Sequence, residues 1–281
     1  MDQFIIKDNK VSFIKDNLLQ AYIEYPNVSK NIVDINHTYV SDSLRGQGIA
    51  EKLLIEAYKY IKSRNLKALT SCSYARNYFN KHKEYQDILV EYIRNYLDKD
   101  FCDVLKITKD KWEKEVEMDK ELSNFIYDFL VRYYLYNNKY CYVGIYNNKI
   151  EGFLLSNEFK ESNDSLNYFN SNLYKLSKTN QVKAKEYLNY IEYNHSLVKS
   201  FMTNNSIYLG LIASNKHNLG AHLIERLKSD AISNNIHELY LWTDETCNYK
   251  YYESINAKLL KTYNVELYGV VIKTFIYKIE F

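Results

Sequence analysis

Apolar and polar residues alternate in short runs over the first forty positions, which is the pattern of half-buried β-strands. Asp-Asn and Pro-Asn pairs separate the runs and favour turns. Apolar residues then recur three and four positions apart from Ile49 to Ile61, which predicts a helix that ends at Arg64-Asn65. The predicted strands are residues 3–7, 10–15, 19–25, 32–40 and 66–72, and a short helix is predicted over 74–81. The first 90 residues therefore predict an α+β unit around one sheet.

The rest of the chain repeats this order of elements. Helical patterns over 88–99 and 109–136 lead to a hairpin that turns at Asn147-Asn148, and helix-like residues without Gly or Pro then run up to Phe201. The remaining predicted elements are strand 206–212, helix 219–233, strand 239–243, short helix 249–254, and strands 258–263 and 270–281. The order strand, glycine-containing turn, long helix, strand, short helix thus occurs twice. We predict two domains of mixed α/β sheet (fold class α+β), which are residues 1–92 and 93–281, with a helical insertion at about 160–203.

Composition narrows the class of protein. The chain has 281 residues with 37 Lys and Arg against 35 Asp and Glu, and this net charge of +2 favours neither a nucleic-acid nor a membrane partner. No apolar run approaches the length of a transmembrane helix, and the first ten residues lack a signal-peptide core. The four cysteines are scattered, without the spacing of a metal site or a disulfide framework: Cys72, Cys102, Cys141 and Cys247. We therefore expect a cytoplasmic protein without a metal.

Two of only seven glycines lie in one loop, residues 45–50, whose sequence is Arg-Gly-Gln-Gly-Ile-Ala. The loop follows a predicted strand and opens the predicted helix. Glycines at the start of a helix let a ligand approach the backbone, and the helix N-terminus offers unpaired N–H groups and a positive dipole end. This combination suits a phosphate or pyrophosphate.

The loop matches the acetyl-CoA motif of the GNAT N-acetyltransferase superfamily, (Gln/Arg)-x-x-Gly-x-(Gly/Ala). With His37-Thr38, Cys72-Ser73-Tyr74 and residues 82–85, the first domain resembles the short YjdJ-type branch of that superfamily. The resemblance implies that loop amides hold the CoA pyrophosphate and that the backbone of Val40 pairs with the pantetheine arm. The residues implied in cofactor binding are Val40, Arg45, Gly46, Gln47, Gly48, Ile49 and Ala50.

Two residues of the first domain are candidate catalytic groups. Cys72, at the end of a strand, could act as a nucleophile, serve the active site without a covalent bond, or only pack. His37 could act as a general base, because its ordinary pKa lies near neutrality, or it could be a strand residue hydrogen-bonded to its neighbours.

The second domain also resembles GNAT proteins, chiefly in its tail, where Asn248 precedes Tyr251-Tyr252-Glu253. The resemblance implies that Tyr252 protonates the departing thiolate and that Asn248 contacts the pantetheine or the bulged strand. The loop that corresponds to 45–48 is 215–218, which has lost both glycines, although Gly220 survives behind it. Lys216 or His217 could compensate by charge. The residues expected to bind the cofactor here are Leu211, Lys216, Asn218, Leu219, Gly220 and Asn248.

The resemblance implies an N-acetyltransferase that moves an acetyl group from acetyl-CoA to a primary amine by direct attack. No carboxylate lies in strand 206–212, so Glu151, Glu192 or a water chain is left as the general base. The acceptor could be a small molecule or a protein amine, and the protein a monomer or a homodimer. The alternative is a non-catalytic CoA-binding or protein-interaction scaffold in which one or both domains are degenerate.

Overall fold

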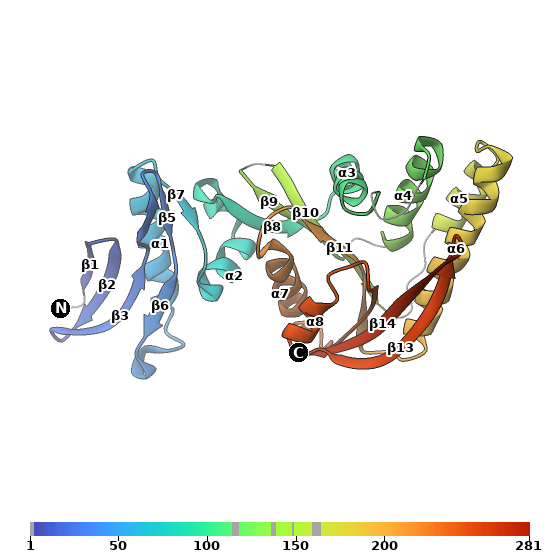
Figure 1. Ribbon diagram of the computed structural model, residues 1–281. Coiled ribbons are helices and arrows are strands. Elements are labelled where there is room, and N and C mark those ends of the chain that lie inside the picture. Colours follow the sequence, from blue (N-terminus) through green and yellow to red (C-terminus); the bar gives the residue numbers. More distant parts are fainter. Residues whose placement is uncertain (1–2, 114–117, 136–138, 148, 159–163) are drawn as a thin grey trace. The chain divides into compact units, whose positions relative to one another are not determined.

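The computed structural model describes residues 3–113, 118–135, 139–147, 149–158 and 164–281. The chain divides into two compact units, which are Met1–Arg94 with Ile145–Lys149 and Asn95–Gly144 with Ile150–Phe281. Figure 1 shows the order of their elements along the chain. Both units combine helices with β-sheet, so the predicted mixed α/β fold class is confirmed.

The first unit holds two small sheets. One has the strand order β1-β2-β3-β6 and the other the order β4-β5-β7. Helix α1 packs on β2 and β3, and its apolar stripe, which includes Leu53, Leu54 and Ala57, lies in the same core as Val11 and Ile23. The elements are β1 Gln3–Lys7, β2 Lys10–Lys15, β3 Leu18–Glu24, β4 Asn27–Ser29, β5 Ile32–Asp34, β6 His37–Val40, α1 Ile49–Ser63, β7 Lys67–Leu69 and α2 Ser73–Lys81.

The predicted strand over 32–40 is two strands in two different sheets. β5 pairs in parallel with β7, whereas β6 pairs antiparallel with β3. The change of partner falls at two residues, because the N–H of Ile35 donates to Leu69 O and the N–H of Asn36 donates to Glu24 O. β6 therefore does not continue the pairing of β5 with β7, and the residues that follow β7 are not its strand partners.

One large sheet has the strand order β13-β14-β12-β11-β10-β9-β8, and most residues of its strands β9 to β14 belong to the second unit. β11 and β12 pair in parallel, and the pairs β10–β11, β12–β14 and β13–β14 are antiparallel. The strands are β8 Glu91–Asn95, β9 Tyr140–Tyr146, β10 Lys149–Glu158, β11 Ser206–Ser214, β12 Glu238–Asp244, β13 Lys258–Leu267 and β14 Val270–Glu280. β8 falls where the chain passes from one unit to the other.

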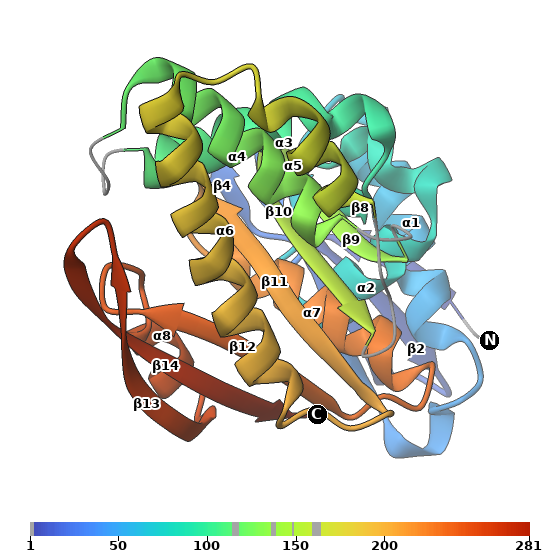
Figure 2. The same cartoon turned by 90° about the vertical axis from the view of Figure 1, so that its right-hand side faces the viewer.

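Helices cover both faces of this sheet. Figure 2 shows α4, α5 and α6 on one face and α7 on the opposite face, as does the view in Figure 1. The side chains of Asp119 and Ser177 cap α4 and α6 by accepting backbone N–H groups of the first turn. The helices are α3 Phe101–Trp112, α4 Lys120–Tyr134, α5 Ser165–Leu173, α6 Lys178–Lys199, α7 Leu219–Ile232 and α8 Lys250–Ser254.

The predicted helix over 88–99 is wrong, because residues 91–95 form strand β8. Leu89, Ile93 and Tyr96 are buried, and their spacing fits one face of a helix. A short apolar run of this kind fits a buried strand equally well, and periodicity does not distinguish the two. The strand order decides, because β8 lies beside β9 in the sheet.

Other predicted elements differ in extent. The helix predicted over 109–136 is two helices, α3 and α4, and α3 starts at Phe101. The predicted insertion contains α5 and α6. Parts of these predictions lie outside the described residues, namely 114–117, 136, Asn148 of the hairpin turn and 160–163. Among the described helices, none is both long enough and apolar enough to cross a lipid bilayer.

Candidate functional site

Strands β11 and β12 are partners along only part of their length. Their parallel pairing covers residues 206–208 and 238–240, and both strands continue beyond it. A cavity of about 1130 Å³ lies beside the unpaired ends, 209–214 and 241–244. Its volume is slightly above the roughly 300–1,000 Å³ of small-molecule sites, so it has room for such a ligand and is the candidate functional site of the second unit.

Strand β11 bulges at Gly210, in the wall of the cavity. The pairing with β10 shifts register between Leu155 and Ser156, because Gly210 is the extra residue. The ring of Tyr134, from α4, lies so close that a Cβ at position 210 would be 2.1 Å from its Cδ1 atom. Only glycine therefore lets this ring approach the strand. The backbone of a bulge is free of ladder pairing, so it is a candidate hydrogen-bond partner for a ligand.

The loop 215–218 and the first turn of α7 line another side of the cavity. Asn218 caps α7 in the left-handed conformation, with φ 64°, which Asn adopts more readily than most residues. Gly48 caps α1 in the first unit with φ 73°, so Asn218 takes the conformation of that glycine. In the first helical turn the N–H groups of Gly220 and Ala221 have no intrahelical acceptor. Together with the helix dipole they form an anion-binding end.

Leu219 fixes this end of α7 to the sheet. Its side chain is fully buried, and a Cβ at Gly144 would lie 2.6 Å from Leu219 Cδ1. Leu219 is therefore a packing residue whose side chain does not line the cavity. Lys216 and His217 do line it, and Lys216 places a positive charge beside the helix end.

Asn248 and Tyr252 line the cavity from the region of α8. The ring of Tyr252 is buried and stacks on Tyr277 at a centroid distance of 5.8 Å. Burial raises the pKa of Tyr252 well above its ordinary value, and the neighbouring Cys247 adds to the effect. The phenol is therefore protonated at neutral pH and can donate a hydrogen bond into the cavity.

Two carboxylates that line the cavity were not predicted from the sequence. Asp244 is the last residue of β12, and Glu186 lies on α6. Glu151 and Glu192, the predicted stand-ins for a general base, are not among the residues that line the cavity. The only local signal for Asp244 is its place at the end of a strand before Thr246, whose N–H and hydroxyl both donate to Asp244 Oδ1.

The glycine loop of the first unit lies between β6 and α1. Gly46 and Gly48 have φ values of 76° and 73°, in the left-handed region, and a Cβ at either position would meet no atom within 4 Å. The backbone conformation, rather than crowding, therefore requires glycine here. Two exposed contacts hold the turn, because Arg45 pairs with Asp42 at 2.9 Å and Gln47 Nε2 donates to the backbone oxygen of Ser43 at 2.8 Å.

The two candidate catalytic residues of the first unit lie on different elements. His37 is on β6. The prediction that Cys72 lies at the end of a strand is wrong, because β7 ends at Leu69 and Cys72 is the N-cap of α2. Thr38 Oγ1 lies 3.4 Å from Cys72 Sγ, at the place where β6 and the chain after β7 part. His37 precedes Thr38 on β6, so its side chain points to the opposite face, where it is exposed and lies beside the ring of Tyr22 at 5.6 Å. The structure does not bring His37 and Cys72 together.

The predicted site residues thus form two groups, one in each unit. In the first unit, Val40 ends β6 opposite Ala21, and the loop and first turn of α1 follow directly. In the second unit the predicted residues that line the cavity are Leu211, Lys216, Asn218, Gly220, Asn248 and Tyr252. Their roles in binding and catalysis stay predictions.

Comparison with known proteins identifies the first unit. Residues 10–88 match the sequence model of the GCN5-related N-acetyl-transferase family. A GCN5-like protein from Staphylococcus aureus with a solution structure is 36% identical, over 31% of this chain and 86% of its own, with a TM-score of 0.28. The chain belongs to the GCN5-related N-acetyltransferase family, and residues 10–88 carry the match.

Two further similarities cover different parts of the chain. The protein NATD1 of Gallus gallus is 38% identical over 63 residues, which are 22% of this chain and 57% of NATD1. The chain thus spans little more than half the length of the curated relatives that it matches. The polyamine N-acetyltransferase of Drosophila melanogaster covers 68% of this chain and 100% of its own, at 10% identity and a TM-score of 0.44.

Proposed function

We propose that the protein is an N-acetyltransferase that moves an acetyl group from acetyl-CoA to a primary amine, and that the reaction takes place in the second unit. The observation that carries this proposal is the cavity beside the parting strands β11 and β12, which adjoins the N-terminus of α7. The same arrangement occurs in the unit that matches the family, where β5 and β7 are parallel and α1 begins at a left-handed cap.

The proposed binding mode uses the backbone of two elements. The N-terminal turn of α7 would hold the CoA pyrophosphate, supported by Lys216. The unpaired edge of β11 offers backbone N–H and C=O groups to the amide groups of an extended pantetheine arm. Leu211 and Asn248 line the cavity between these two regions and the buried Tyr252.

The proposed chemistry is direct transfer. The amine nitrogen forms a C–N bond with the thioester carbon, the C–S bond breaks, and the leaving thiolate takes a proton from Tyr252. The phenol regains a proton from those that the amine releases. The unpaired backbone at the Gly210 bulge is the candidate donor to the carbonyl oxygen, which gains negative charge as the bond forms.

For the first unit a second candidate function is non-catalytic CoA binding. The loop and helix start of the family motif are present. However, His37 lies on the face of the sheet away from Cys72, so this histidine cannot act as a base toward a group bound beside the thiol.

Calorimetric titration of the full chain with acetyl-CoA tests both assignments. Ala50 and Gly220 hold the same position in α1 and α7, two residues after each cap. Glutamate at this position is favourable for the helix but repels a phosphate. We expect Gly220→Glu to weaken acetyl-CoA binding roughly tenfold or more, as one unfavourable charge contact would, and to reduce acetyl transfer. Ala50→Glu should remove only a second binding event and leave transfer unchanged.

The matched controls are Gly220→Gln and Ala50→Gln, which add the same bulk without the charge. The proposal is wrong if acetyl-CoA does not bind, or if Gly220→Glu binds and reacts like Gly220→Gln. Transfer that is lost in Ala50→Glu but kept in Gly220→Glu would move the reaction to the first unit.

A further inference from the structure

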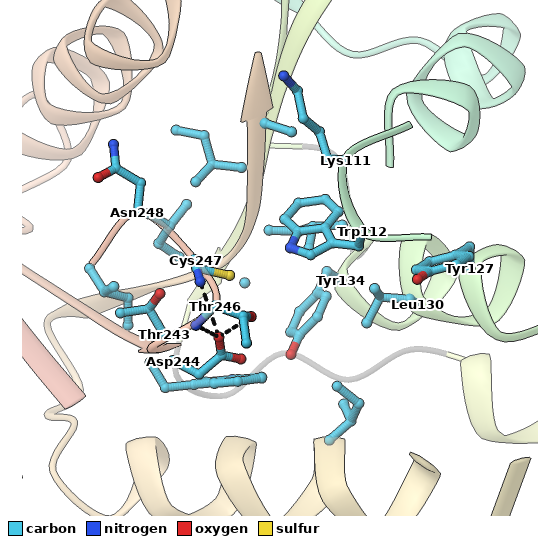
Figure 3. A pocket seen from close by; sticks show the side chains of 18 of the residues that line it. Lys111, Trp112, Tyr127, Leu130, Tyr134, Thr243, Asp244, Thr246, Cys247 and Asn248 are labelled. Atoms are coloured by element: carbon cyan, nitrogen blue, oxygen red, sulfur yellow. Dashed lines mark hydrogen bonds between the residues drawn. The ribbon is translucent and has the colours of Figure 1, made fainter. Parts of the chain in front are cut away.

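The cavity of the second unit has a wall whose chemistry the cofactor does not explain. Asp244 and Glu186 line it together with many aromatic rings. Figure 3 shows Asp244, Thr246 and Cys247 on one side of the cavity, and Trp112 and Tyr134 on the other. This wall is formed by residues of α3, α4, α6, β12 and the β13–β14 hairpin, and the helix end of α7 is a separate part of the lining.

Asp244 is a buried carboxylate that has no cationic partner in the described part of the chain. It is 8% exposed, and Tyr190 Oη donates to its Oδ2 at 3.2 Å. Its Oδ1 accepts the N–H of Thr246 at 3.0 Å and that of Cys247 at 3.2 Å. Among the described residues, no Lys, Arg or His forms an ion pair with Asp244. A buried carboxylate gains substantially from a cation, and a ligand in the cavity can supply one.

Glu186 is the second acidic group of this wall. Its Oε1 accepts the N–H of Tyr268, at the tip of the β13–β14 hairpin, and within the described residues it has no ion-pair partner. Glu186 and Tyr190 are four residues apart on α6, so they lie on one face of the helix about 6 Å apart along its axis. Because Tyr190 reaches Asp244, the two carboxylates lie along one continuous strip of the wall.

Aromatic side chains surround this strip. The rings that line the cavity here are Trp112, Tyr127, Tyr134, Tyr187, Tyr190, Trp242 and Tyr268. Aromatic faces attract ammonium groups, and the attraction is stronger where water is excluded. Burial raises the pKa values of Tyr187, Tyr190 and Tyr268, so these phenols are neutral and do not add further negative charge.

We propose that this wall binds an acceptor with two amino groups, so that the substrate class is a small aliphatic diamine. The inference rests on the proposed acetyl transfer. The amino group at Asp244 is the one to be acetylated, because Cys247, which hydrogen-bonds Asp244, is also a neighbour of Tyr252. Glu186 holds the second group as an ammonium, at the other end of the strip. Because Tyr190 lies between Glu186 and Asp244, the two amino groups must be separated by an aliphatic chain of several carbons.

The test compares two acceptors of equal length, 1,4-diaminobutane and 4-amino-1-butanol, with the full chain. The alcohol keeps one amine and replaces the second ammonium with a hydroxyl group. We expect kcat/KM for the diamine to be roughly tenfold or more above that for the amino alcohol, the effect of one buried charge-assisted contact. Glu186→Gln keeps an acceptor for the Tyr268 N–H, so it should fold, and it should lower only the diamine value, so that the preference falls to about threefold or less.

Glu266→Gln is the matched control, because Glu266 is an exposed carboxylate on β13 that does not line the cavity. It should keep the wild-type preference. Acetyl-CoA affinity, measured by calorimetry, should be the same in all three proteins.

The outcomes separate the two proposals. If acetyl-CoA binds and amines are acetylated, but the amino alcohol matches the diamine or Glu186→Gln keeps the preference, the diamine inference is wrong and the acetyltransferase stands. If acetyl-CoA does not bind, the proposed function is wrong. Calorimetric titration with 1,4-diaminobutane then still tests whether the wall binds a diamine. The inference requires that 1,4-diaminobutane binds and that Glu186→Gln weakens this binding.

Discussion

Tyr252 is held in place by aromatic packing. Its ring stacks on Tyr277 and meets Tyr251 edge-on at 5.5 Å, and within the described residues its hydroxyl makes no hydrogen bond to the protein. A hydroxyl in the cavity lining without a protein partner has its donor capacity left for a ligand. The raised pKa of this phenol keeps the proton on the oxygen at neutral pH, so that a donor is present when the thiolate leaves.

Tyr252→Phe removes this donor and leaves the ring stacking intact. We expect kcat for acetyl transfer to fall roughly a hundredfold, within the range for loss of a general acid, and the Kd of acetyl-CoA to change little. Steady-state kinetics and calorimetry on the same preparation measure both. Tyr249→Phe is the control, since Tyr249 stacks on Phe275 outside the cavity lining. A Tyr252→Phe protein with the full kcat would mean that the thiolate takes its proton from water.

Residues within one motif could be predicted from the sequence, and residues joined only by packing could not. Asn248 and Tyr252 follow each other within a few positions, and both line the cavity as expected. Asp244 and Glu186 line the same cavity only because α6 packs across β12, and neither has a periodic or spaced partner that would single it out. The side of the sheet on which His37 lies could not be predicted either, because it depends on how β6 aligns with β3.

At the scale of elements, most strands and long helices could be predicted because their buried stripes are regular. Helices α1 and α7 begin at the predicted residues. The pattern of β8 predicts a helix instead of a strand, because sheet pairing is a non-local interaction that the local pattern does not show. The bulge in β11 could not be predicted from the sequence either. It depends on the register with β10 and on the ring of Tyr134 from a distant helix.

Gly210→Ala tests whether this bulge and α4 are packed as one unit. The new Cβ would lie 2.1 Å from Tyr134 Cδ1, so the ring or the strand must move. Overpacking of this kind costs about 1–3 kcal/mol, which a urea unfolding curve would show as a lower midpoint. Gly220→Ala is the control, because its Cβ would be 3.7 Å from Ser214 Oγ and alanine favours a helix by up to about 1 kcal/mol. Equal stability of Gly210→Ala and wild type would show that the ring of Tyr134 can move away without a loss of stability.

At the scale of the whole molecule, sequence similarity and the cavity fall in different units. The family match lies within residues 10–88, and the cavity lies between α6, α7 and the strands of the second unit. The glycine loop of the first unit is easier to recognise in the sequence, because its two glycines form a motif. The second unit reaches a comparable helix cap with Asn218. Sequence similarity therefore marks the unit with the glycine loop, whereas the large cavity depends on how distant elements of the second unit pack.

The stability of the second unit should depend on one buried histidine. His195, on α6, packs against Tyr133 of α4 and Tyr208 of β11, with ring distances of 5.4 and 4.9 Å. It is 7% exposed, and its Nδ1 atom has no hydrogen-bond partner in the described part of the chain. Burial, with a smaller contribution from Lys199, lowers the pKa of His195 to about 3 from an ordinary 6.5.

The sign of the effect follows from proton linkage. Between these two pKa values the unfolded chain binds a proton at His195 and the folded chain does not, so the free energy of unfolding falls as the pH is lowered below about 6.5. The expected slope from this residue is about 1.4 kcal/mol per pH unit.

His195→Phe keeps a ring between the two tyrosines and cannot titrate, so its stability should fall less between pH 6.5 and 4.5. Urea unfolding at several pH values measures the difference from wild type, in which the carboxylates common to both proteins cancel. His237→Gln, which alters an exposed histidine, should keep the wild-type slope. Equal slopes for His195→Phe and wild type would mean that the folded protein accepts the proton at His195, and that α4, α6 and β11 separate enough to hydrate it.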